Sequence, residues 1–262
     1  MLIKVLVENN SGDLCKGEKG LSLYIEADNK KILLDTGETS LFLENASKLN
    51  VTLNDLDFVV LSHGHFDHGD GLRFIKNKKL ICHPDSFKRR FRKRDSSYLG
   101  LHMDLERANS KFDLTITREP YKLSENITFL GEIPRENNFE SKNTPFKFEN
   151  GEDDFVLDDS ALVINSEKGL IVIPGCSHSG ICNIISYAKK VTGVDNVYAV
   201  IGGLHLMNLD NATYKAIDFL KKENISIFYP IHCTKKIVAD EISKLLINTL
   251  VKRSFSGDTI SL

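Results

Sequence analysis

The chain has 262 residues, with 34 Lys and Arg against 36 Asp and Glu and a formal net charge of −2 at pH 7. Apolar residues make up 41% and charged residues 27%, which is typical of a globular protein and excludes a disordered chain. The near-neutral charge excludes a nucleic-acid coat over the whole surface, no apolar run approaches the roughly 18–20 residues of a membrane span, and without a signal peptide we expect a cytoplasmic protein.

The first third of the chain is predicted to be rich in strands. Leu41, Leu43, Ala46 and Leu49 fall roughly on one face, which predicts a helix over 40–49. Apolar runs and alternating patterns predict strands over 3–8, 21–27, 31–34, 57–62 and 80–83.

The middle third, residues 84–155, carries charge runs and little regular period. We interpret it as an insertion or lid within a single domain that spans 1–262, with strand character at 114–117 and 127–130 and a polar loop over 137–154. Six of the seven residues in Lys88–Arg94 are basic. This run predicts either attraction of a phosphorylated substrate or an RNA backbone, or a solvated face paired with nearby acids.

The last third is regular. Strands are predicted over 161–165, 169–174, 197–201 and 225–230, the first two as a hairpin, and helices over 180–191, 211–223 and 236–251. Buried strands that alternate with helices indicate sheet layers covered by helices. His63, His178, His205 and His232 each follow a strand end, where sites gather in layered α/β folds.

The strongest chemical signal is the run His63-Gly64-His65-Phe66-Asp67-His68. Imidazole and carboxylate are ligands that zinc and similar divalent metals prefer. In an extended segment His63 and His65 point to the same side and can bind one metal, while Asp67 and His68 follow a turn later and can reach a second. The alternative interpretations are a polar loop or a zinc clip without chemistry.

This run matches the HxHxDH signature of the metallo-β-lactamase superfamily, which the chain resembles over most of its length. The resemblance implies an α/β fold, an αββα sandwich with 84–155 as an inserted part, and a binuclear metal site. Asp35, in Leu33-Leu34-Asp35-Thr36-Gly37, matches the early aspartate that supports the metal loop.

The superfamily supplies further ligands after later strands. His232 matches its last metal histidine, and we expect it to be a ligand. Many relatives carry a bridging aspartate where this chain has Cys176, with His178 two residues later. We favour His178 as the ligand, while Cys176 or Asp159 remains an alternative or additional one, and Asp158-Asp159 could instead form a solvated turn. His205 is the candidate general acid or oxyanion contact, or else a buried structural histidine; His83 is interpreted as structural, and nothing supports a role for His102.

The combination of DTG, SHGHFDHGDG, DDSALVI, GLIVIPGCSHSGI, GGLHL and PIHCT resembles the subgroup named 7,8-dihydropterin-6-methyl-4-(β-D-ribofuranosyl)aminobenzene-5′-phosphate synthase-like. We therefore predict a metal-dependent hydrolase that uses a metal-activated water on a small anionic substrate, phosphorylated or ester-type and pterin-related. The predicted metal ligands are His63, His65, Asp67, His68, His178 and His232, and Asp67 and His205 are the predicted catalytic residues.

Two divalent ions are expected, zinc before iron or manganese. One alternative is a metal-dependent nuclease or phosphodiesterase that binds RNA through Lys88–Arg94. Another, from a different class, is a non-catalytic or redox metal-binding protein. The sequence does not indicate an oligomeric state.

Overall fold

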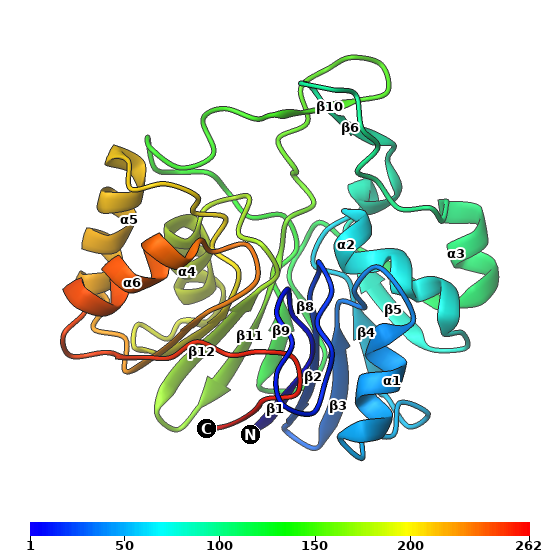
Figure 1. The fold of residues 1–262 in the computed structure, drawn as a ribbon, viewed down its shortest axis with the longest axis horizontal. Coiled ribbons are helices and arrows are strands. Elements are labelled where there is room, and N and C mark those ends of the chain that lie inside the picture. Colours follow the sequence, from blue (N-terminus) through cyan, green and yellow to red (C-terminus); the bar gives the residue numbers. More distant parts are fainter. The chain divides into compact units, whose positions relative to one another are not determined.

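Two seven-stranded sheets organise residues 1–262, all of which the computed structural model describes (Figure 1). Unit 1 comprises 1–118, 144–158 and 255–262, and unit 2 comprises 119–143 and 159–254. Each unit has its own sheet and its own helices. No helix has the length and apolar character needed to cross a membrane.

The sheet of unit 1 has the strand order β16-β1-β2-β3-β4-β5-β7. Neighbours from β16 to β3 pair antiparallel, and those from β3 to β7 pair parallel. The strands are β1 (Leu2–Val7), β2 (Ser22–Ala27), β3 (Lys30–Leu34), β4 (Phe58–Val60), β5 (Lys79–Cys82), β7 (Asp113–Ile116) and β16 (Thr259–Ser261). A separate antiparallel pair joins β6 (Arg90–Arg92) to β10 (Phe146–Phe148).

One face of this sheet packs against the helices of unit 1. Leu33, Val59 and Leu80 share a buried cluster with Phe42 of α1 and Ala108 of α3. Because side chains alternate along a strand, Ile32, Leu34, Val60 and Ile81 point to the opposite face, and they are buried as well. The helices are α1 (Leu41–Lys48), α2 (Phe66–Gly69) and α3 (Leu105–Lys111), with 3-10 turns η1 (Asp70–Phe74) and η2 (Pro84–Phe87).

The sheet of unit 2 has the order β15-β14-β13-β12-β11-β9-β8, and β12 to β15 run parallel. Figure 1 shows its helices on one side of the sheet. The strands are β8 (Tyr121–Lys122), β9 (Ile127–Phe129), β11 (Ala161–Ser166), β12 (Gly169–Pro174), β13 (Val197–Gly202), β14 (Ile227–Pro230) and β15 (Leu250–Val251). The helices are α4 (Ile181–Thr192), α5 (Asn211–Lys222) and α6 (Lys236–Leu245).

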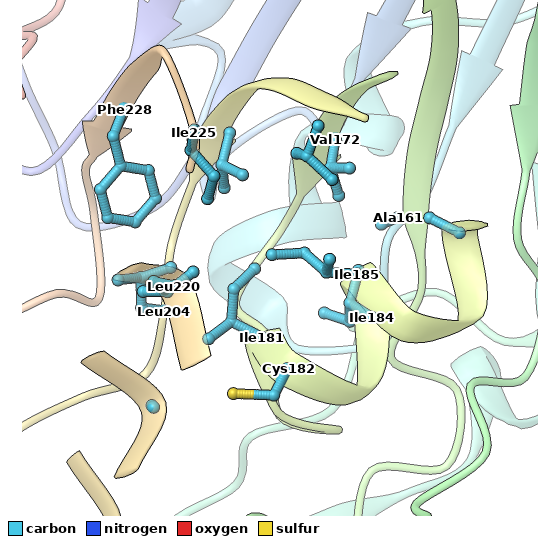
Figure 2. Packing of buried hydrophobic residues seen from close by; sticks show 14 of the residues in the cluster. Ala161, Val172, Ile181, Cys182, Ile184, Ile185, Leu204, Leu220, Ile225 and Phe228 are labelled. Carbon is cyan, nitrogen blue, oxygen red and sulfur yellow. The ribbon is translucent and has the colours of Figure 1, made fainter. Parts of the chain in front are cut away.

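The core of unit 2 lies between these helices and the sheet. Figure 2 shows Ile181 and Ile185 of α4 directed toward Val172 of β12, with Leu220 of α5 near Phe228 of β14. Each of these side chains is at most 1% exposed. Burial of one aliphatic or aromatic side chain of this size contributes about 1.5–3 kcal/mol, so this layer holds the strands that end at the candidate ligands.

Each predicted helix and strand is present in the structure, but the predicted length of the last helix is wrong. It was expected over 236–251, whereas α6 ends at Leu245 and β15 pairs parallel with β14. The run 250–251 joins the sheet because β14 offers it backbone hydrogen bonds, a long-range effect that periodicity cannot detect. Strand β10 also interrupts the loop predicted over 137–154, and the pattern did not indicate β6 or β16.

Residues 84–155 contribute strands to both sheets. The predicted strand character at 114–117 and 127–130 is confirmed by β7 in unit 1 and β9 in unit 2. The remainder of the range supplies β6, β10 and α3 to unit 1 and β8 to unit 2. A lid role for this range stays a prediction.

Candidate metal centre

The histidine-rich loop of unit 1 begins directly after β4 and ends in the short helix α2. His65 is the residue before α2, and Asp67 and His68 lie within the helix. The ring nitrogens Nε2 of His63 and Nδ1 of His65 are 3.0 Å apart, and the ring centroids of His63 and His68 are 4.2 Å apart. All four side chains are buried, none above 7% exposed. The structure therefore gathers the three imidazoles, as their spacing predicts.

Asp35 orients two of these imidazoles. Its Oδ2 accepts hydrogen bonds from His68 Nδ1 at 2.6 Å and from Ser62 Oγ at 2.7 Å. Because the Ser62 hydroxyl donates to Asp35, it accepts from His63 Nδ1 at 2.9 Å. The protons of His63 and His68 are thereby assigned to Nδ1, and Nε2 is the nitrogen that each ring would offer to a metal. The supporting role predicted for Asp35 is confirmed.

Asp158 holds the same loop from a second direction. Its Oδ2 accepts the backbone N–H of Gly64 at 2.7 Å, and its Oδ1 accepts from Arg90 at 2.9 Å. Arg90 is fully buried and also lies 3.4 Å from Asp154. Burial disfavours the charged guanidinium, but the neighbouring carboxylates outweigh that effect and the pKa of Arg90 is raised.

Gly64 is a position where a side chain has no room. A Cβ built there would lie 1.9 Å from the carbonyl oxygen of Ser86. The close approach of the two backbones sets the path of the loop between His63 and His65. Beyond them, Asp67 forms a salt bridge with Lys19 at 3.1 Å.

The later candidate residues of unit 2 follow the ends of three neighbouring parallel strands. Cys176 and His178 follow β12, His205 follows β13 and His232 follows β14. His205 and His232 have positive φ angles of 50° and 52°, which cost energy for residues other than glycine and are typical of functional sites. The rings of His178 and His205 are 4.2 Å apart between centroids.

Cys233 ties these three loops together. Its Sγ accepts the backbone N–H of His205 at 3.2 Å and donates to the carbonyl oxygen of Cys176 at 3.4 Å. Ser177 Oγ adds a hydrogen bond to the carbonyl oxygen of Gly203 at 2.6 Å. The sequence does not indicate this role of Cys233, because hydrogen bonds between separate loops leave no local pattern.

A thiol lies among the candidate ligands of unit 2. The ligand atoms of Cys176, His232 and Cys233 are all within 4.8 Å of one another. His178, which sequence reasoning preferred over Cys176, is half-buried beside His205. Cys176 and His178 therefore both follow the end of β12.

Asp158 and Asp159 do not form a solvated turn, because they are at most 1% exposed. Asp159 Oδ2 accepts the N–H of Ser179 at 2.9 Å and its hydroxyl at 2.5 Å. Burial raises the pKa of the Asp159 carboxyl to about 6, and the hydrogen bonds from Ser179 oppose this rise. Asp159 is thus placed to hold the turn that carries His178.

The other motifs that the sequence singled out have local partners. His83 Nδ1 accepts the N–H of Asp85 at 3.1 Å, which agrees with its structural interpretation. Each cation of Lys88–Arg94 forms an ion pair, with buried Arg90 as the innermost member. His102, to which the sequence assigned no role, pairs with Asp70.

The residues of unit 1 fit a divalent metal. Three imidazoles lie together in a buried loop. The Asp35 carboxylate accepts a hydrogen bond from His68 Nδ1 directly, and it is linked to His63 Nδ1 through the Ser62 hydroxyl. This is the outer hydrogen bonding that metal-ligating histidines use in proteins. The donor set suits zinc, iron or manganese.

Comparisons with known proteins agree with this chemistry. The sequence profile of the Metallo-beta-lactamase superfamily matches residues 16–190. The chain is 38% identical to the 7,8-dihydropterin-6-methyl-4-(beta-D-ribofuranosyl)-aminobenzene-5'-phosphate synthase of Methanocaldococcus jannaschii, over 83% of this chain and 81% of that protein. It is 36% identical to the uncharacterized protein MJ0448 of the same organism, over 93% of this chain and 94% of the relative.

Among solved structures, the chain is similar to Tm1679, described as a metal-dependent hydrolase of the beta-lactamase superfamily. The TM-score is 0.89 at 26% identity, and the match covers 100% of this chain and 99% of that one. The fold class predicted from the HxHxDH run is thereby confirmed. The chain belongs to the metallo-β-lactamase superfamily.

Proposed function

We propose that this protein is a metal-dependent hydrolase that acts on a small anionic substrate, a phosphate ester or another ester. The observation that carries the proposal is the buried set of imidazoles in the loop of unit 1, oriented by Asp35 and held by Asp158. Burying several polar side chains together costs free energy, and metal binding can offset this cost. Clusters of this kind are typical of functional sites.

The chain's own residues have separate roles in this proposal. Bound divalent ions supply a water of lowered pKa and positive charge that stabilises a developing oxyanion. The proposed ligands are His63, His65, Asp67, His68, His178 and His232, with zinc as the expected metal and two ions as the expected number. His205 is proposed to give a proton to the leaving group, and Asp35 fixes the ring orientations of His63 and His68.

The pterin-related substrate class is the finer part of the proposal. Its support is the 38% identity to a protein named as a dihydropterin-linked aminobenzene phosphate synthase. A phosphorylated substrate also agrees with the need for an anion near divalent metal ions.

Elemental analysis of purified protein by plasma mass spectrometry tests the proposal. We expect about two equivalents of zinc, a loss of at least half of it in His65→Ala, and retention in the matched variant His102→Ala. Phosphomonoesters, phosphodiesters and lactones are then screened with the metal-loaded protein. Unchanged metal in His65→Ala would refute the site, and two equivalents of iron would favour the redox alternative.

A further inference from the structure

A cavity of about 450 Å³ lies in unit 1, and none of its lining residues is a proposed metal ligand. Its volume is in the range of pockets that bind small organic ligands. Three of its lining residues are polar or charged and four are aromatic or aliphatic. They are Phe87, Arg89, Tyr98, Leu101, His102, Met103 and Asp104.

Arg89 is the one Lys or Arg side chain that lines the cavity, and it shares its charge with Glu149. Its Nε donates to Glu149 at 2.9 Å, and its two terminal amino groups make no hydrogen bond within the protein. The guanidinium carbon lies over the ring of Tyr98, 5.3 Å from the ring centroid, which is within the range of a cation–π contact. A guanidinium held in this way presents paired donors to a planar or tetrahedral anion.

His102 is held in place by Asp70, which lies two residues after His68. Its backbone N–H donates to Asp70 Oδ1 at 2.8 Å, and its Nδ1 donates to Asp70 Oδ2 at 2.6 Å. Asp70 is 2% exposed, whereas the side chain of His102 is 57% exposed. The far nitrogen of the ring is therefore available to a ligand, and Tyr98 packs edge-on against the ring at 5.2 Å.

The remaining lining residues decide the shape of the ligand. Phe87, Tyr98, Leu101 and Met103 provide apolar and aromatic surface that suits a flat ring. The one acid, Asp104, is already engaged because its side chain caps α3 by accepting the N–H of Arg107 at 2.8 Å.

We propose that this cavity binds a planar aromatic group that carries an anionic substituent. The ring lies against the apolar lining, and the anion pairs with Arg89 and hydrogen-bonds to His102. The inference rests on the proposed function in one respect, since the group is expected to be the unreacting part of the hydrolysed ester. A separate regulatory anion would share the same chemistry.

The cavity is connected to the metal loop through covalent and packing contacts. Asp70 follows the candidate ligand His68 by two residues, and a Cβ on Gly69 would lie 2.7 Å from Leu101 in the cavity wall. The N–H of Phe66 also donates to the carbonyl oxygen of Leu99 at 3.0 Å. A ligand in the cavity therefore contacts the segment that packs on the loop.

Binding of naphthalene-2-phosphonate, measured by calorimetry on the metal-loaded protein, tests the inference. The wild type is expected to bind this probe at least tenfold more tightly than methylphosphonate, which lacks the ring, or 2-naphthamide, which lacks the charge. Arg89→Met is expected to weaken binding roughly ten- to hundredfold, because charge-assisted hydrogen bonds are lost. His102→Ala is expected to weaken it several-fold.

The matched control is Arg94→Met. Arg94 belongs to the same basic run but pairs with Asp95 and does not line the cavity, so its variant is expected to bind like the wild type. An equal loss in Arg94→Met and Arg89→Met would overturn the inference, because it would show general attraction of polyanions such as RNA. Equal binding of the three probes would overturn it as well.

Metal content and thermal midpoint are measured for every variant, so misfolding and metal loss are recognised directly. If the wild type lacks metal, the proposed function fails while probe binding still tests the cavity. If the probe inhibits ester hydrolysis competitively, the cavity binds a part of the substrate. If the inhibition is not competitive, the cavity binds a separate regulatory anion.

Discussion

Asp35 combines a strained backbone with a buried charge. Its φ angle is +58°, it is fully buried, and its carboxylate accepts hydrogen bonds from the backbone and hydroxyl of Ser62 and from His68. Residues other than glycine pay about 1–3 kcal/mol for such a conformation, which persists only where the surroundings impose it. The conformation places the carboxylate within hydrogen-bonding distance of Ser62 and His68.

Asp35→Asn is expected to weaken metal binding about 10–100-fold, because an amide nitrogen replaces one of the acceptors that orient His63 and His68. Competition with a chelating dye measures the affinity. Asp55→Asn serves as the control, since Asp55 is exposed and pairs only with Lys31. An unchanged affinity in Asp35→Asn would contradict the positioning role.

Arg90 is the buried member of an otherwise exposed basic run. Arg90→Met leaves the carboxylates of Asp154 and Asp158 buried without their cation, and the expected loss in the free energy of unfolding is about 3–5 kcal/mol. Urea denaturation measures it. Arg94→Met, at a side chain that is 78% exposed, is expected to change stability by less than about 0.5 kcal/mol. Equal losses of stability in the two variants would contradict a stabilising role for the ion pairs of Arg90 with Asp154 and Asp158.

At the scale of elements, parallel strands bring distant residues to one edge. β12, β13 and β14 are neighbours in the sheet, and the loops after them carry Cys176, His205 and His232. The helices that connect these strands must be stable for the edge to form. Between β13 and β14, α5 has a side-chain cap at Asp210, whereas α4, between β12 and β13, begins after Gly180 without one.

Asp210→Ala is expected to lower the free energy of unfolding by about 1 kcal/mol, because the N–H of Thr213 loses its acceptor at 2.8 Å. Chemical denaturation measures the change. Asp218→Ala, in the interior of the same helix, replaces an exposed acid by a better helix former and is expected to be neutral or slightly stabilising. A larger loss in Asp218→Ala would contradict this account of the cap.

At the scale of the whole molecule, metal binding and folding are linked. A ligand that binds only the folded chain stabilises it by about 4 kcal/mol at a thousandfold excess over its dissociation constant. Removal of metal with EDTA is therefore expected to lower the thermal midpoint by several degrees, as measured by calorimetry. His65→Ala should show a smaller shift, and equal shifts would contradict metal binding by this loop.

Nucleic-acid binding is also decided at this scale. The net charge is −2, and the cations of Lys88–Arg94 pair with acids, among them Asp85, Asp95, Glu149 and Asp153. Few counterions are then released on contact with a phosphate backbone. We expect RNA binding to be weak with a shallow dependence on salt, measured by fluorescence anisotropy. A steep dependence would restore the nuclease alternative.

The local part of the site could be predicted from the sequence. The spacing His63, His65, Asp67 and His68 determines which side chains are near one another, because they share one short loop. Alternation and helical periodicity likewise indicated most strands and helices, since both patterns arise from neighbours along the chain. Because these patterns located the strands, they also predicted that His178, His205 and His232 follow strand ends.

Only the tertiary structure decided which polar groups became buried partners. Arg90 looked like one cation among six, and Asp158 resembled a turn residue, yet they meet each other and the backbone of Gly64. The pairing of Asp70 with His102 and the ties of Cys233 to two other loops are also contacts between distant segments. Burial and long-range hydrogen bonding depend on how sheets and loops pack, and that information is spread over the whole chain.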